Sequence, residues 1–239
     1  MVKRILFLSA ILFFNLCFLG YAQTVDDYFS RGISKQSQKD FSGAIADFTQ
    51  AIRINPQYAV SYFCRGICNA EITNHERAIA DFTKTIEINP LHAQAFYHRA
   101  LSKYAIADFK GAVDDFSRVT IFDPNRVEAY YHRALAKHAI PDYYGAIEDF
   151  SKVLTFDTKN KKALFNRALS RFAQNDYGAA VVDLEAVIEL DPTYVEAYYY
   201  KGVALYRHGY KSQGCIELLK AKEMGKQGIE TMLRDYCNQ

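Results

Sequence analysis

The sequence predicts an all-α solenoid, a fold in which one helical unit is repeated and stacked. Residues 142–150, Asp-Tyr-Tyr-Gly-Ala-Ile-Glu-Asp-Phe, have counterparts that begin at Asp40, Asp108 and, more loosely, Asp176. The step from Asp108 to Asp142 equals that from Asp142 to Asp176, and the step from Asp40 to Asp108 is twice as long. After each copy an acidic or amide residue precedes a residue that is usually proline, at the same interval: Asn55-Pro56, Asn89-Pro90, Asp123-Pro124, Asp157-Thr158 and Asp191-Pro192. A strict period of this length is typical of one supersecondary unit that is copied and stacked.

The first 22 residues have the pattern of a signal peptide. Lys3 and Arg4 precede an apolar run of 15 residues, 5–19, and small residues lie at the −3 and −1 positions of a cut after Ala22. The run is shorter than the roughly 20 residues of a membrane-spanning helix. We therefore expect export, to the periplasm or beyond, most simply in a bacterial envelope. An uncleaved anchor and a lipoprotein modified at Cys17 are the alternatives.

The charge of the mature chain argues against a nucleic-acid partner. The formal net charge of +2 includes Lys3 and Arg4, so the chain without its signal peptide is close to neutral. Its charges are scattered singly, and clustered phosphate neutralisation is what nucleic-acid binding needs. After the signal peptide no apolar stretch is long enough to cross a bilayer, so we expect no integral membrane segment.

Six units of equal length tile the chain without linkers, and a capping helix is predicted after them. The predicted units are 25–58, 59–92, 93–126, 127–160, 161–194 and 195–228, and the predicted cap is 229–239. Apolar residues within each unit are spaced as in helices, so each unit is expected to be a helical hairpin. A polar residue falls where the second helix should begin and is expected to cap it: Asp40, Asn74, Asp108, Asp142 and Asp176.

Three positions of the repeat carry the packing. The eighth is small: Gly32, Gly66, Ala100, Ala134, Ala168 and Gly202. The twentieth is also small: Ala44, Ala78, Ala112, Ala146, Ala180 and Gly214. The twenty-fourth is bulky: Phe48, Phe82, Phe116, Phe150, Leu184 and Leu218. Small residues allow paired helices to approach closely, and the bulky residue fills the space that remains.

With these positions and proline at the thirty-second, the chain resembles the tetratricopeptide repeat family, whose helix-turn-helix unit is about 34 residues long. The resemblance implies a right-handed superhelix that acts as a non-catalytic scaffold for a protein or peptide. Two positions depart from the family pattern. Its frequent Trp at position four is replaced by Tyr28, Tyr62, Phe96, Tyr130, Leu164 and Tyr198. Its Tyr at position eleven is mostly replaced by basic residues, and the sixth unit is irregular near Gly209.

The resemblance also places a binding surface. In the family, positions five and twelve face the concave groove, and in this chain aromatic residues accumulate there from the third unit onward. The predicted groove residues are Tyr97, Tyr104, Tyr131, His138, Phe172 and Tyr199. Such rings bury a large area and their polar edges pair with a peptide backbone. We expect an adaptor for an extended peptide or protein segment, with the assembly of envelope complexes as its setting. The alternative is a saccharide- or small-ligand-binding module that uses the same groove.

A charged pair recurs between positions seven and twenty-three. The basic members are Arg31, Arg65, Arg99, Arg133, Arg167 and Lys201. The acidic members are Asp47, Asp81, Asp115, Asp149, Asp183 and Glu217. They lie at one level on antiparallel helices, so we expect a structural ladder of exposed ion pairs, each contributing about 0 to 1 kcal/mol.

Catalysis, metal binding and cofactors are not expected. His98 and His132 are equivalent in successive units and two imidazoles could approach one metal, but a third ligand is missing. No metal, phosphate-loop or nucleophile motif occurs.

Two pairs of cysteines remain after signal cleavage. Cys64 and Cys68 are one helical turn apart, where a bridge is geometrically poor, and are expected to be small buried groups. Cys215 and Cys237 are candidates for a disulfide that fastens the cap, because they lie on helices that should be adjacent.

Overall fold

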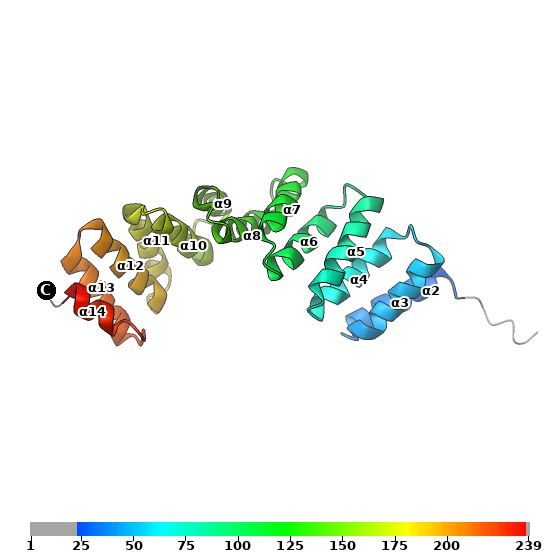
Figure 1. Ribbon diagram of the computed structural model, residues 1–239, viewed down its shortest axis with the longest axis horizontal. Coiled ribbons are helices and arrows are strands. Elements are labelled where there is room, and N and C mark those ends of the chain that lie inside the picture. Colours follow the sequence, from blue (N-terminus) through cyan, green and yellow to red (C-terminus); the bar gives the residue numbers. More distant parts are fainter. Residues whose placement is uncertain (1–22, 238–239) are drawn as a thin grey trace, which may run out of the picture. The chain divides into compact units, whose positions relative to one another are not determined.

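The computed structural model describes residues 23–237, which form thirteen helices and no strand (Figure 1). The predicted signal peptide, including Cys17, lies outside the described residues. Within residues 23–237, no helix combines the length and the apolar character needed to cross a membrane.

The chain divides into two compact units, with the boundary after Pro90. Unit 1 holds α2 (Val25–Ser37), α3 (Phe41–Ile54), α4 (Ala59–Glu71) and α5 (His75–Ile88). Unit 2 holds α6 (Ala93–Ala105), α7 (Phe109–Phe122), α8 (Val127–Ala139), α9 (Tyr143–Phe156), α10 (Lys161–Ala173), α11 (Tyr177–Leu190), α12 (Val195–His208), α13 (Lys211–Glu223) and α14 (Glu230–Cys237).

Inside each unit every helix packs against the next helix of the chain. In unit 1 the pairs α2 with α3 and α4 with α5 are hairpins, and α3 joins them by packing on α4. The same order continues through unit 2, from α6 to α14. The predicted all-α solenoid of helical repeats is confirmed.

The core is made by the three packing positions. Phe48, Phe82, Phe116, Phe150, Leu184 and Leu218 are all fully buried. Close approach is most marked where the eighth position is glycine: a Cβ on Gly32 would lie 2.6 Å from the ring of Phe48. Burial of a large apolar side chain contributes about 1.5 to 3 kcal/mol, so each bulky twenty-fourth residue stabilises its hairpin by that order.

A left-handed residue connects the two helices of the repeats, and the sequence prediction did not include it. The fifteenth position has positive φ at Lys39, Thr73, Ala107, Asn175 and Gly209. In this conformation the N–H of Ala107 reaches the carbonyl of Tyr104 at 3.0 Å and ends α6. Only glycine adopts such a backbone without cost, and Gly209 is the one glycine at this position.

The predicted caps are confirmed with one exception. Asp40, Asp108, Asp142 and Asp176 each accept a hydrogen bond from the backbone N–H three residues later. Asn74 occupies the same place before α5, but its side chain makes no capping hydrogen bond, so that part of the prediction is wrong. The helix that follows has Glu76 in its first turn, which compensates the helix dipole.

The last helix is fastened to the array by a disulfide and by ring stacking. Cys215 in α13 and Cys237 in α14 are bonded, with their Cα atoms 5.6 Å apart, so the candidate disulfide is confirmed. The rings of Tyr206 and Tyr236 stack at 4.0 Å. Ile229 and Leu233 are buried in the same cluster as Leu218, and thus close the end of the hydrophobic core.

Cys64 and Cys68 are free thiols, as expected. Burial raises the pKa of Cys64 to about 11 and that of Cys68 to about 12. Both thiols are therefore protonated at neutral pH and behave as small apolar groups.

Candidate peptide-binding surface

The charged ladder forms in every repeat, but its aspartates are not exposed. Arg133 pairs with Asp149 at 2.6 Å, and Arg167 with Asp183 at 2.7 Å. The exposed fraction of the five aspartates is only 3 to 5%. The expectation of exposed pairs is wrong, because the helices of a hairpin approach closely enough to cover the carboxylates.

A second cation meets the same carboxylate in four repeats. Lys35, Lys103, Lys137 and Arg171, at position eleven, each lie 2.8 Å from the acid of their repeat. This explains why the family's tyrosine is replaced there. The bond from Arg31 holds the pKa of Asp47 below its usual value, against burial. That contribution to stability is present above the usual pKa of an aspartate and is lost as the pH falls through the lowered one.

The arginines also join consecutive repeats. Arg65 donates to the hydroxyl of Thr49 at 3.0 Å, and Arg167 to that of Ser151 at 3.0 Å. Both hydroxyls belong to the preceding repeat. In the last repeat Lys201 lies between Glu185 of the preceding repeat, at 3.1 Å, and its own Glu217, at 3.0 Å. The ladder is thus an internal network and does not offer free charges to a ligand.

The predicted groove residues at position five are anchored inside their own hairpins. The ring of Tyr97 packs edge-on against Phe116 at 5.7 Å, and that of Tyr131 against Phe150 at 5.8 Å. Each tyrosine therefore covers the bulky core residue with one edge.

Position twelve shows a second constant contact. Tyr104 meets Phe109, His138 meets Tyr143 and Phe172 meets Tyr177, each with ring centroids 5.2 Å apart. His138 also shares a hydrogen bond of 2.9 Å with the hydroxyl of Ser170 in the next repeat. These contacts fix the orientation of the rings before any partner arrives.

The six residues do not share one pocket, and one of them, Tyr97, is largely covered. Only 9% of Tyr97 is exposed, and the guanidinium of Arg126 lies 3.8 Å from its ring centroid. Tyr199 packs against the cluster that holds the cap, and the ammonium of Lys226 lies 5.0 Å from its ring. The half-buried side chains of Tyr104, Tyr131, His138, Phe172 and Tyr199 keep surface for a ligand.

A pocket of about 260 Å³ opens beside Tyr131. Its lining is Val127, Glu128, Tyr131, His132, Val153, Asn160 and Lys162. The hydroxyl of Tyr131 accepts from the Asn166 amide at 3.3 Å. The pocket thus combines an aromatic edge, an amide and two opposite charges.

Glu128 and Lys162 were missed by the sequence reasoning. Both occupy position two of their repeats, three residues before position five, and residues three apart share a helix face. That spacing was the available signal.

The histidines of this surface are neutral groups at pH 7. Burial, together with the nearby charges of Arg126 and His92, lowers the pKa of His98 to about 4. Burial also lowers the pKa of His132 and of His138. His132 stacks on Phe116 with centroids 5.9 Å apart, which is a packing role. Among residues 23–237 no group of three or more His, Cys, Asp or Glu could hold a metal ion.

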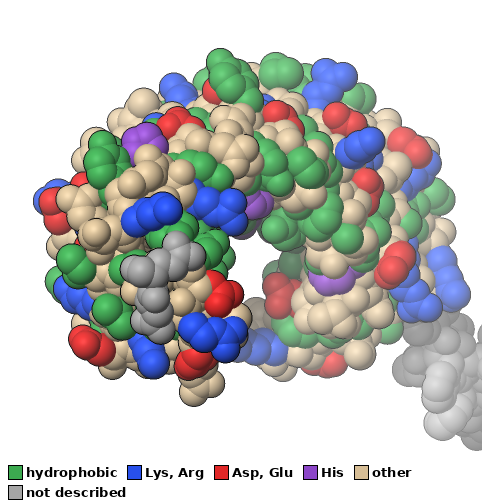
Figure 2. All heavy atoms as spheres, turned by 60° about the vertical axis from the view of Figure 1, so that its left-hand side comes forward, with side chains coloured by type: hydrophobic (Ala, Val, Ile, Leu, Met, Phe, Trp, Pro, Cys, Tyr) green, Lys and Arg blue, Asp and Glu red, His purple; other side chains and the backbone are tan. Residues whose placement is uncertain are grey.

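Acidic and basic side chains alternate over the visible face of the molecule, without a broad field of one sign (Figure 2). This distribution agrees with the near-neutral charge of residues 23–239.

Comparison with family models finds the repeat in both units. A model described as TPR repeat matches residues 168–209, and a model described as tetratricopeptide repeat matches residues 28–58. A search of curated proteins found no match.

Solved structures share the fold. YrrB, described as a TPR protein with an unusual peptide-binding site, is 20% identical with a TM-score of 0.70, over 80% of this chain and 97% of its own. MamA 41-end from Desulfovibrio magneticus RS-1 is 20% identical with a TM-score of 0.67, over 71% of this chain and 96% of its own. A tetratricopeptide repeat protein from Parabacteroides merdae ATCC 43184 is 18% identical with a TM-score of 0.58, over 92% of this chain and 85% of its own.

The repeat period, the stacked hairpins, the two family models and these structural relatives agree. The fold is typical of non-catalytic scaffolds, and repeats of this kind bind proteins or peptides. The chain is a tetratricopeptide repeat protein.

Proposed function

We propose that this chain is an exported scaffold that binds an extended protein segment along α6, α8, α10 and α12. The observation that carries the proposal is the pocket beside Tyr131, which lies among half-buried rings recurring at positions five and twelve. Rings already fixed by contacts within their hairpins lose little freedom when a ligand binds.

The chemistry of the pocket suits a peptide. Its volume of about 260 Å³ has room for one side chain of a bound segment. The Tyr131 hydroxyl accepts a bond from Asn166 and keeps its own proton for a carbonyl of the peptide, and Glu128 and Lys162 offer charges of both signs. The peptide-binding site in the description of YrrB supports the same use of the fold.

Export is supported by two independent features. The first 22 residues have the charge, length and small-residue pattern of a cleaved signal peptide. The disulfide between Cys215 and Cys237 is a bond that persists in oxidising compartments such as the periplasm. Together they favour a role in the assembly of envelope complexes.

Binding is tested on the surface itself. A peptide selected from a random library on the mature protein should lose at least about 2 kcal/mol of binding free energy with Tyr104→Ala and Tyr131→Ala combined, because central aromatic anchors dominate such interfaces. Titration calorimetry measures the loss. The matched control is Tyr144→Ala with Tyr210→Ala, because both rings are more than half exposed and lie outside the surface.

A glycan panel run in parallel distinguishes the saccharide alternative. Binding of a glycan and of no peptide would reject the protein-scaffold proposal. So would a double variant at Tyr104 and Tyr131 that loses much stability while its folded fraction keeps full affinity, since those rings would then serve packing alone.

Export is tested by the mass of the mature amino terminus. Protein recovered from the envelope fraction of bacterial cells should begin at Gln23, because the small residues Gly20 and Ala22 mark the cleavage site. A chain that begins at Met1, or that carries lipid on Cys17, would contradict the proposal.

A further inference from the structure

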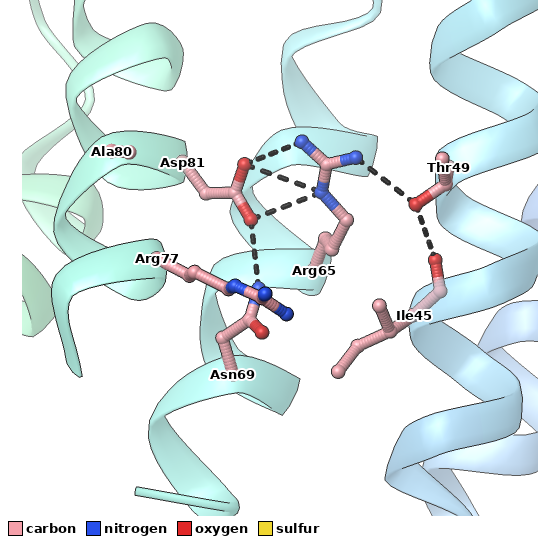
Figure 3. A pocket seen from close by; sticks show the side chains of 7 residues that line it. All are labelled: Ile45, Thr49, Arg65, Asn69, Arg77, Ala80 and Asp81. Carbon is pink, nitrogen blue, oxygen red and sulfur yellow. Dashed lines mark hydrogen bonds and ion pairs between the residues drawn. The ribbon is translucent and has the colours of Figure 1, made fainter. Parts of the chain in front are cut away.

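A second pocket lies in unit 1, between α3, α4 and α5, and its volume is about 320 Å³. Its lining is Ile45, Thr49, Arg65, Asn69, Arg77, Ala80 and Asp81 (Figure 3). This pocket shares no lining residue with the pocket beside Tyr131.

At this pocket the second repeat departs from the charge pattern of the first, third, fourth and fifth repeats. In those four repeats position eleven is a Lys or Arg bonded to the buried acid, and position nineteen is small: Gly43, Gly111, Gly145 and Ala179. In the second repeat position eleven is Asn69 and position nineteen is Arg77. The second cation of the repeat has therefore moved from α4 to α5.

The move leaves the cation without a carboxylate. Asp81 already receives hydrogen bonds from Arg65, the shortest of 2.7 Å, and from the Asn69 amide at 3.0 Å. The remaining guanidinium nitrogen of Arg65, Nη1, donates a hydrogen bond to the hydroxyl of Thr49 at 3.0 Å. No residue of the described chain forms a hydrogen bond or ion pair with the Arg77 guanidinium, which reaches across the pocket beside Asn69 in Figure 3. The pocket thus has one free cation and a net charge of one positive unit.

We propose that this pocket binds the carboxylate of a glutamate or aspartate side chain from a partner protein. A guanidinium offers a planar pair of N–H donors that matches a carboxylate in two parallel hydrogen bonds. Ile45 and Ala80 supply apolar surface for the methylene groups that carry such a carboxylate. Arg77 and Ala80 are exposed, so a side chain can enter from solvent.

The probe is the blocked peptide acetyl-Gly-Glu-Gly-amide, which has one carboxylate, and its neutral counterpart carries Gln in place of Glu. Both are titrated into the mature protein labelled with nitrogen-15, and the side-chain amide of Asn69 is followed by NMR. The Glu peptide should shift this resonance to saturation, and the Gln peptide should not. Sodium phosphate at the same ionic strength forms a third arm, because a site for free anions would respond to it equally.

Three variants distinguish binding in the pocket from a general attraction of the peptide to positive charge. Arg77→Ala should weaken the Glu peptide about tenfold or more, as expected for loss of a charge-assisted pair. The matched control Lys110→Ala removes one exposed cation from α7 and should leave binding unchanged. Asn69→Lys with Arg77→Gly rebuilds the pattern of Lys103 with Gly111 and should stay folded by circular dichroism. Because this variant has no Asn69 amide, its binding is followed by the backbone amide resonances of α5, which the Glu peptide should no longer shift.

Binding that persists within twofold in Arg77→Ala overturns the proposal. An equal response to the Gln peptide or to phosphate overturns the assignment to a protein carboxylate. Neither result bears on the peptide surface around Tyr131, which is tested with different residues.

Discussion

Ala107, the residue between α6 and α7, holds a backbone conformation that its side chain opposes. Its φ of 62° lies in the left-handed region, where an L-residue is disfavoured and glycine is not. Ala107→Gly should therefore raise the free energy of unfolding by about 0.5 to 1 kcal/mol, despite the greater freedom of glycine in the unfolded chain. Urea denaturation of a chain of residues 23–239 measures the change.

The control for this prediction is at the end of the preceding helix. Ala105 ends α6 in a helical conformation and is exposed. Ala105→Gly should lower the free energy of unfolding by about 0.5 to 1 kcal/mol, because glycine is unfavourable in a helix. Shifts of the same sign in the two variants would show that the turn conformation is not the cause.

At the scale of a hairpin, the bulky side chain of α7 decides stability. Phe116 is fully buried, and its ring meets Tyr97 at 5.7 Å and His132 at 5.9 Å. Phe116→Ala should lower the free energy of unfolding by about 3 to 5 kcal/mol, because it leaves a cavity between helices. Since repeats are held by their neighbours, the loss should be greatest in α6, α7 and α8. Hydrogen exchange of those helices measures where the array opens.

Phe122, at the end of the same helix, provides the comparison. It is 37% exposed and meets Phe96 at 5.7 Å. Phe122→Ala should cost much less than Phe116→Ala, because solvent fills the space that the ring leaves. Thermal unfolding that is unchanged in Phe116→Ala would mean that the ring does not hold the hairpin together.

At the scale of the molecule, the periodic features were predictable and the exceptions to the period were not. Phe116 and its equivalents could be placed because packing demands the same residue type in every repeat. The burial of Asp149 could not, because the sequence shows a charge and not the depth at which two helices cover it. Ala107 shows the same limit, since alanine gives no sign of a left-handed turn.

The candidate site divides in the same way. Tyr131 was placed through the family pattern, and the pocket beside it includes that residue. The aromatic pattern did not predict Glu128 and Lys162, because these residues lie one helical turn before the aromatic positions. The nearly complete burial of Tyr97 in α6 follows from Arg126, which stands at the start of α8, and no local pattern announces a contact between residues so far apart in the chain.

The bonds that join consecutive repeats bear on how such a chain can lengthen. Arg133 reaches its own Asp149 and Ser117 of the repeat before it, and Arg167 reaches Asp183 and Ser151 in the same manner. Each of these repeats therefore carries an acid for its own arginine and a hydroxyl for its successor's. If a gene duplication copied residues 127–160 in tandem, Ser151 of the first copy would accept a hydrogen bond from the arginine of the second copy. No buried charge would be left without a partner.

The carboxyl-terminal junction follows another rule. Lys201 lies between two glutamates, and one of them, Glu185, replaces the hydroxyl of the earlier repeats. A duplicated unit inserted directly before the last repeat would put a serine opposite that lysine and remove one of its partners. Tandem duplication of a repeat therefore preserves these bonds within the array, but it removes one of them when the copy is inserted directly before the last repeat.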